Sequence, residues 1–214
     1  PVTRTTSSKV VTPSASLPQT QPACATDVTT KLLDCGNWAV SASWTVPEDA
    51  VSGIYLAKAV RRDTGGASHI VFVVRDDASS SDILFQTSDT TWQAYNSYGG
   101  DYIEYPDYGY PTTRAFKGSY NRPFVTRDSP GGLGAFNWLF HAEYPMVRWL
   151  EANGYDVSYF SGVDSDRRGE QIQDHKVFAS VGHDEYWSGQ QRAHVEAARE
   201  AGVHLAFFSG NEVY

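Results

Sequence analysis

His183 and Glu185 have side chains that could carry acid–base or metal chemistry. They are separated by one residue and follow an apolar run that ends at Val181. On a turn from a strand into a helix, this spacing lets an imidazole and a carboxylate face the same cleft, where they could transfer protons or bind a metal ion. His-x-Glu is a short motif. An alternative is that the acidic residues here only stabilise the positive end of the following helix.

Three further polar groups follow other apolar runs. Asn211 comes after Ser209 and Gly210, and its amide could polarise a carbonyl or hold a water, unless it only forms a Gly-Asn turn. Tyr95 could present its phenol to the same cleft or pack as an aromatic wedge between sheet and loop. Asp164 and its acidic and basic neighbours are typical of a solvated turn.

The elements that must position these residues are continuous apolar strands of the kind buried on both faces of a sheet. Helical spacing of three to four residues lies between the later ones. One helix is predicted from Trp138 to Gly154, with Pro145 either kinking it or marking a start in its first turn. Another is predicted from Ser188, with Gln191 completing a capping-box pattern, to a C-cap glycine at 202. The predicted strands are residues 69–74, 83–85, 157–160, 177–181 and 204–208.

Strand, helix, strand, helix, strand over 138–208 predicts two right-handed crossovers and therefore neighbouring parallel strands. The fold class is α/β, a flavodoxin-like or class I glutamine-amidotransferase-like three-layer sandwich with a mostly parallel sheet. Ligands bind such sheets beyond the carboxyl ends of the strands. We therefore expect Tyr95, His183, Glu185 and Asn211 to gather at one rim.

The earlier part of the chain has a different character. Residues 1–36 are rich in Ser, Thr, Pro and Gln and predict an extended linker or the tail of an upstream domain. Residues 37–52 alternate apolar and polar, which predicts an antiparallel strand from a β-sandwich. Residues 53–214 form the α/β domain. Within it, the Tyr-rich stretch 96–130 is a long surface loop that could line a groove for a sugar or peptide, or simply pack.

Composition excludes several partners. A formal net charge of -8 disfavours nucleic acid and anionic membranes, and no run of 18 apolar residues could span a bilayer, so a small molecule is the expected ligand. No Gly-x-Ser-x-Gly, P-loop or Gly-x-Gly-x-x-Gly follows any strand, which removes support for serine-hydrolase and nucleotide chemistry. Cys24 and Cys35 favour a disulfide over two free thiols, and with it an extracellular location.

Four segments together, Thr91–Asn96, Tyr144–Glu151, Gly182–Trp187 and Gly210–Asn211, resemble the C-terminal domain of the large (beta) subunit of N,N-dimethylformamidase. The resemblance covers roughly residues 53–214. It implies a glutamine-amidotransferase-like α/β fold, and the enzyme for which the family is named is an amide hydrolase. The family continues through further strands and helices, so we expect upstream and downstream domains in the same polypeptide. Asp184 stands where the enzyme has proline.

The resemblance also implies one iron ion held by two tyrosines and one glutamate. Glu185 would be the carboxylate ligand, Tyr95 one phenolate and Tyr55 the other, with Tyr120 in reserve. His183 and Asn211 would be their catalytic neighbours. Phenolate and carboxylate are hard donors, and a bound ion would deprotonate a tyrosine that normally titrates near pH ~10.

Two functions follow. The first is a secreted, metal-dependent hydrolase of C–N amide bonds, bacterial like many members of the family, in which His183 is acid, base or orienter. The second is a non-catalytic extracellular module that binds a glycan or another surface component.

Overall fold

The computed structural model describes residues 20–96, 98–99, 114–124 and 138–213. The chain divides into two compact units, residues 1–45 with 90–141, and residues 46–89 with 142–214. Most of the Tyr-rich loop predicted at 96–130 lies outside the described residues. No helix in the described part of the chain is long and apolar enough to cross a membrane.

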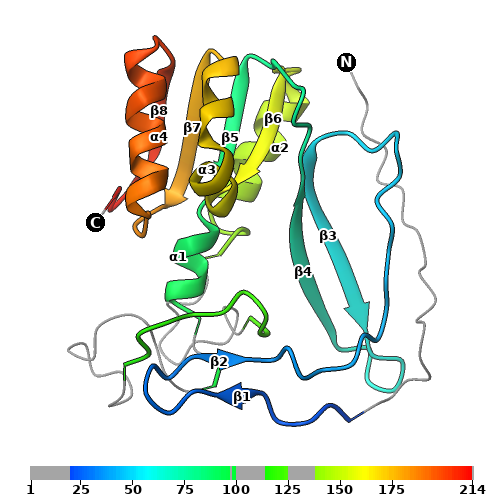
Figure 1. Ribbon diagram of the computed structural model, residues 1–214. Helices are drawn as coiled ribbons and strands as arrows, with labels where there is room; N and C mark the ends of the chain where they lie inside the picture. Colours follow the sequence, from blue (N-terminus) through cyan, green and yellow to red (C-terminus); the bar gives the residue numbers. More distant parts are fainter. Residues whose placement is uncertain (1–19, 97, 100–113, 125–137, 214) are drawn as a thin grey trace. The chain divides into compact units, whose positions relative to one another are not determined.

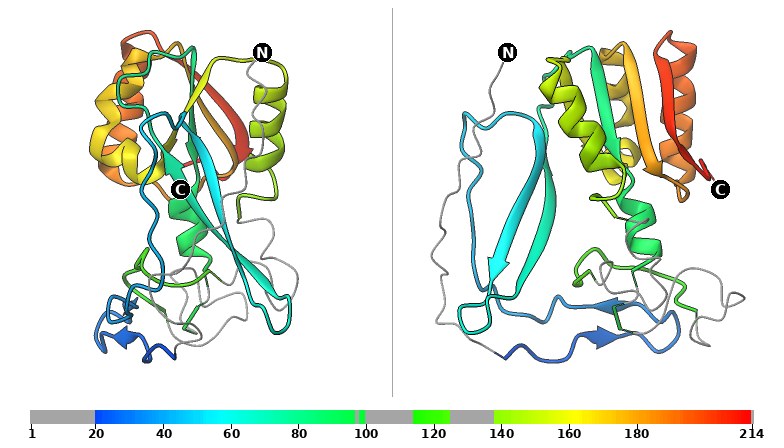
Figure 2. Two further views of the ribbon diagram at one scale, coloured as in Figure 1. Left: turned by 90° about the vertical axis from the view of Figure 1, so that its right-hand side faces the viewer. Right: turned by 180° about the vertical axis from the view of Figure 1, so that it is seen from behind.

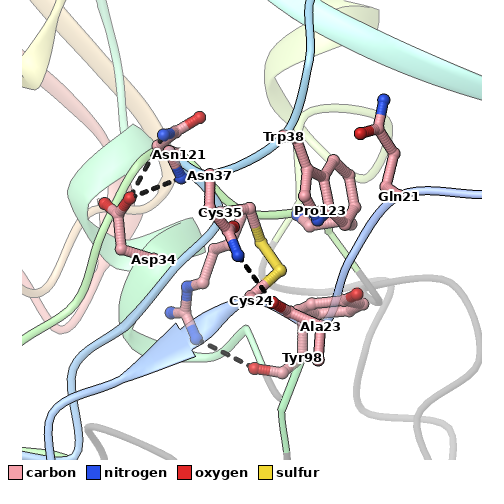
Figure 3. Close-up of a disulfide and its surroundings, with 12 residues drawn as sticks. Gln21, Ala23, Cys24, Asp34, Cys35, Asn37, Trp38, Tyr98, Asn121 and Pro123 are labelled. Carbon is pink, nitrogen blue, oxygen red and sulfur yellow. Dashed lines mark hydrogen bonds between the residues drawn. A yellow bond between two sulfur atoms is a disulfide. The ribbon is translucent and has the colours of Figure 1, made fainter.

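The first unit contains a two-stranded antiparallel sheet of β1 (Ala25–Thr26) and β2 (Leu33–Asp34). A disulfide joins Cys24 and Cys35 at the outer ends of these strands, as the sequence predicts (Figure 3). Asp34 accepts hydrogen bonds from the side chains of Ser119 and Asn121, which fasten residues 119–121 to the disulfide loop. Cross-linking and side-chain hydrogen bonds therefore order a unit that has little regular secondary structure.

The structure differs from the sequence prediction at residues 37–52, where no strand forms. The backbone N–H of Ala39 donates to the Gln21 side chain at 3.0 Å, and the Gln21 amide donates back to the Ala39 carbonyl at 3.0 Å. A side chain thus satisfies backbone groups that a neighbouring strand would otherwise satisfy. Alternation of apolar residues gave no information about this competing partner.

The second unit begins with a β-hairpin. Strand β3 (Gly53–Val60) pairs antiparallel with β4 (Ala67–Val74) over its whole length, from Gly53 opposite Val74 to Val60 opposite Ala67. Residues 69–74, predicted as a strand of the main sheet, therefore belong to a separate two-stranded sheet.

Four parallel strands form the main sheet, in the order β6-β5-β7-β8 (Figure 1). The parallel pairing is as predicted. The prediction that successive strands are neighbours fails for β6 and β7, because β5 lies between them and pairs with both. The four strands are β5 (Ile83–Thr87), β6 (Val157–Ser161), β7 (Val177–His183) and β8 (His204–Gly210).

Helices cover both faces of this sheet (Figure 2). Val147 and Leu150 of α2 (Glu143–Ala152) pack with Phe85, and Val195 of α4 (Gly189–Glu200) packs with Leu84 on the opposite face. Adjacent strand residues point to opposite faces, so the sheet separates two apolar cores. The unit is therefore a three-layer α/β structure.

The remaining helices are short. Helix α1 (Asp89–Ala94) follows β5, and α3 (Gly162–Arg168) with the 3-10 helix η3 (Gly169–Asp174) connects β6 to β7. Ser161 and Asp164 form a capping box at the start of α3, so the acidic stretch predicted as a solvated turn is helical.

The predicted ends of the longer helices hold, but α2 begins at Glu143, five residues after the predicted start at Trp138. Pro145 is the third residue of α2, so of the two alternatives for this proline, a kink or a place in the first turn, the second is correct. The Ser188 hydroxyl accepts from the Gln191 N–H at 2.9 Å, and Gly202 has φ of +102° just after α4. Strand β8 differs from the prediction of full burial, because Phe207 and Phe208 are 43% and 63% exposed.

Candidate functional site

The strand order defines where a ligand site belongs in the second unit. From β5 the chain passes to β6 on one side, and from β6 it returns to β7 on the other side of β5 (Figure 1). The connections that leave β5 and β7 therefore diverge. Sheets of this kind bind ligands in the crevice beyond the carboxyl ends of the strands at such a point.

Three of the predicted residues come together at this edge. His183 Nε2 lies 2.9 Å from Glu185 Oε2 and 3.3 Å from Asn211 Nδ2. The side chains of His183 and Glu185 are only 19% and 7% exposed. The structure thus unites His183, Glu185 and Asn211 in one cluster, which we call the rim cluster.

The rim cluster follows from the parallel pairing of β7 and β8. The ladder ends with His183 opposite Gly210, so the residue after Gly210 necessarily lies beside the histidine. Gly182 has φ of +96°, and a Cβ there would lie 3.2 Å from the Ala142 Cβ. Both the backbone conformation and the close approach of α2 therefore require glycine before His183.

One imidazole nitrogen cannot donate to Glu185 and accept from Asn211 at the same time. With a carboxylate at Glu185, the proton belongs on Nε2, and the lone pair of the neutral ring is then on Nδ1. A hydrogen bond from the Asn211 amide to Nε2 instead requires the tautomer with the ring proton on Nδ1. The proton of the neutral His183 ring can therefore lie on either nitrogen.

Beneath the rim cluster lies a second set of polar side chains, all fully buried. Asp184 Oδ2 accepts from Ser180 Oγ at 2.7 Å and from Gln86 Nε2 at 2.8 Å. Gln191 Nε2 of α4 donates to Gln86 Oε1 at 3.0 Å, which fixes the orientation of the Gln86 amide. Burial raises the pKa of Asp184 to about 6, although the hydrogen bond from Ser180 opposes this shift.

Two glutamates near these strand ends have strongly raised pKa values. Glu143, the first residue of α2, is 2% exposed, and its Oε1 accepts from both the N–H and the hydroxyl of Ser88. Burial raises the pKa of Glu143 to about 8. Burial, followed by the charge of Asp184, raises the pKa of Glu212 to about 8 as well. Both are carboxylic acids at neutral pH.

The tyrosines expected as metal ligands are divided between the two units. The hydroxyl of Tyr55 donates to the Val51 carbonyl at 2.9 Å, so binding a metal would require it to give up this bond. Tyr95 belongs to the first unit, where its N–H donates to the Thr91 carbonyl at 3.1 Å, and its relation to Glu185 stays a prediction. Tyr120, the reserve, also belongs to the first unit and is 50% exposed.

Among the described residues, no three His, Cys, Asp or Glu side chains are grouped closely enough to hold a metal ion. Tyrosine oxygens would have to complete any such set. Of the two expected ligands in the second unit, Glu185 lies in the rim cluster, whereas the Tyr55 hydroxyl donates to the Val51 carbonyl.

Sequence reasoning missed the buried acceptors and donors around Asp184. Gln86 and Ser180 each interrupt an apolar strand, and a polar residue inside such a run is the available signal, since it must find a partner when buried. Glu143 carried no comparable signal, because it begins an amphipathic helix where acidic residues are common.

The comparison with known families agrees with these observations. The family model described as N,N-dimethylformamidase beta subunit-like, C-terminal, matches residues 3–214. The chain belongs to this family. No individual curated protein matches it.

The family match extends the resemblance seen in the sequence. It begins at residue 3 instead of near residue 53, so the disulfide-bonded segment lies within the part that the dimethylformamidase-like family shares. The rim cluster and the buried Asp184 network also lie within the matched residues.

Proposed function

We propose that this dimethylformamidase-like chain contributes to hydrolysis of C–N amide bonds in small molecules. The observation that carries the proposal is the contact of His183 Nε2 with Glu185 and Asn211, at 2.9 and 3.3 Å, beyond the carboxyl ends of β7 and β8. An imidazole held by a carboxylate and accompanied by an amide is suited to acyl transfer. Family membership supports the same reaction class.

The chemistry assigns one role to each member of the rim cluster. Glu185 accepts the Nε2 proton of His183 and orients the ring, so that Nδ1 takes a proton from water as the water oxygen bonds to the amide carbonyl carbon. Asn211 Nδ2 donates to the developing oxyanion. When the C–N bond breaks, the imidazolium returns the proton to the leaving nitrogen. The products are a carboxylic acid and an amine.

The iron site implied by the family resemblance remains part of the proposal, with Glu185, Tyr95 and Tyr55 as ligands. A bound iron ion would polarise an amide carbonyl and lower the pKa of water. In the structure the hydroxyl of Tyr55 donates to the Val51 carbonyl. The proton transfers above use only His183, Glu185 and Asn211, and none of them depends on iron.

The finer fold and the location are proposals of the same kind. The three layers, the parallel sheet and the site beyond the strand ends support a flavodoxin-like or glutamine-amidotransferase-like fold. The Cys24–Cys35 disulfide supports secretion, because disulfides persist in oxidising compartments.

The test is amine release from a panel of small amides that begins with N,N-dimethylformamide. We expect His183→Gln and Glu185→Gln each to lower the rate at least about 100-fold, the usual size of a general-base contribution. His204→Gln is the matched control, since this exposed histidine lies at the opposite end of β8. Iron is assayed separately by metal analysis and by a tyrosinate-to-iron absorption band.

Two results would end the hydrolase proposal. One is equal activity of Glu185→Gln and the unmodified chain. The other is no hydrolysis of any amide together with saturable binding of a glycan, which would favour the non-catalytic binding module.

A further inference from the structure

The turn after β8 has an unfavourable backbone conformation. Asn211 and Val213 both have φ of +54°, in the left-handed region. Asparagine tolerates this region, but a β-branched residue such as valine adopts it only when surrounding contacts impose it. Some interaction must therefore hold residues 211–213 in place.

Two contacts tie this turn to β7 and to the residue that follows it. Glu212 Oε1 lies 3.3 Å from Ser180 Oγ, and the Val213 N–H approaches the Asp184 carbonyl at 3.4 Å. On the other side of Asn211, the ladder ends with Gly210 opposite His183. Asn211 thus lies between two anchored residues, Gly210, which pairs with His183, and Glu212, whose side chain contacts Ser180.

Counting protons decides which group donates in the contact between Glu212 and Ser180. The Ser180 hydroxyl has one hydrogen, and its 2.7 Å contact with Asp184 Oδ2 takes it. Asp184 Oδ2 also accepts from Gln86, and above its pKa of about 6 Asp184 is a carboxylate that can only accept. When Asp184 is ionised, the hydrogen between Ser180 and Glu212 comes from the carboxylic acid of Glu212.

We propose that Glu212 is a positioning residue, which in its protonated form donates to Ser180 and thereby holds the Asn211 amide against His183. Its importance for catalysis rests on the proposed function, but the positioning itself does not. Ionised Glu212 would place a second negative charge beside Asp184, and the turn would lose its bond to Ser180.

Charge and burial agree with this assignment. The charged or titratable groups around the turn are Asp184 behind Ser180, with His183 and Glu185 on the side of Asn211. Burial and the charge of Asp184 raise the pKa of Glu212 to about 8. The turn should therefore be held near pH 7, between the pKa values of Asp184 and Glu212, and released as the pH rises through about 8.

The experiment compares Glu212→Gln, Glu212→Ala and the control Glu200→Gln, whose glutamate is exposed, by NMR from pH 6 to 9.5 without substrate. The Glu212 carboxyl carbon should titrate near 8. The Asn211 side-chain amide signals should shift with the same midpoint in the unmodified chain and in Glu200→Gln. In Glu212→Gln the amide donates at every pH, so these signals should stay at their low-pH positions.

Glu212→Ala should show the high-pH positions throughout. If it does not fold, the carboxyl titration of the unmodified chain still decides the matter. A Glu212 midpoint near the ordinary glutamate value, or an Asn211 shift that persists unchanged in Glu212→Gln, overturns the proposal. Neither readout needs amide hydrolysis. The positioning role of Glu212 and the proposed hydrolase function can therefore fail independently of one another.

Discussion

The buried side chains of single residues set the chemistry beyond the carboxyl ends of the sheet. Asp184 is fully buried and keeps its carboxylate because Ser180 and Gln86 donate to it, whereas Glu143 keeps its proton because burial outweighs the two donors of Ser88. Donor supply against desolvation thus decides the charge at each position. The fold therefore sets which of these buried carboxyl groups near the rim cluster are charged at neutral pH.

Glu143 gives a testable pH dependence. Its pKa rises from 4.5 to about 8 on folding, so the folded chain binds one more proton than the unfolded chain between these values. Its stabilising contribution is complete below about pH 4.5 and falls by about 1.4 kcal/mol per pH unit until pH reaches the folded value. We expect Glu143→Gln, whose amide oxygen still accepts from Ser88, to be less sensitive to pH in this window.

The measurement is urea unfolding at several pH values from 5 to 8. Glu48→Gln is the control, because this glutamate is exposed. A slope that is identical in Glu143→Gln and in the control would show that Glu143 does not carry the extra proton.

At the scale of elements, the end of β7 is the most constrained point. Gly182 precedes the rim cluster with φ of +96°, close to Ala142 at the start of α2. Position 182, the last but one of β7, therefore favours glycine, the residue without a Cβ. This constraint fixes the direction in which His183 leaves the sheet.

Gly182→Ala should lower the free energy of unfolding by about 1–3 kcal/mol, because alanine is strained at positive φ and its methyl group meets Ala142. Gly189→Ala is the matched control. Gly189 is the first residue of α4 with open space around its Cα, so alanine there should be neutral or slightly stabilising. Chemical denaturation of both variants tests this, and equal stabilities would contradict it.

At the scale of the whole molecule, the two units are stabilised in different ways. The second unit has an apolar core on each face of its sheet. The described part of the first unit packs Trp92, Phe124 and Trp138 against one another, and it also has two very short strands and a disulfide across 11 residues of sequence. Its stability should depend on the redox state of the surroundings.

Removing the cross-link should therefore cost stability. For a loop of this length, the loop-closure model gives about 3 kcal/mol. Thermal unfolding of the paired variant Cys24→Ser with Cys35→Ser, compared with the oxidised chain, measures the loss. An unchanged melting temperature would mean that the hydrogen bonds of Asp34 hold the loop without the disulfide.

The sequence by itself determined the features that depend on neighbouring residues. It placed four of the five predicted strands of the main sheet, the caps at Ser188 and Gly202, the disulfide and the family, and it selected His183, Glu185 and Asn211 as residues that could act together. Periodicity, capping and short motifs are local, so they are readable in one chain.

Only the tertiary structure decided which distant segments pair and what they bury. It placed β5 between β6 and β7, gave residues 69–74 to a hairpin with β3, and left residues 37–52 without a strand. It also brought Ser180, Gln86 and Glu212 around Asp184. Strand pairing and proton positions depend on contacts between residues far apart in the chain, and no local pattern records them.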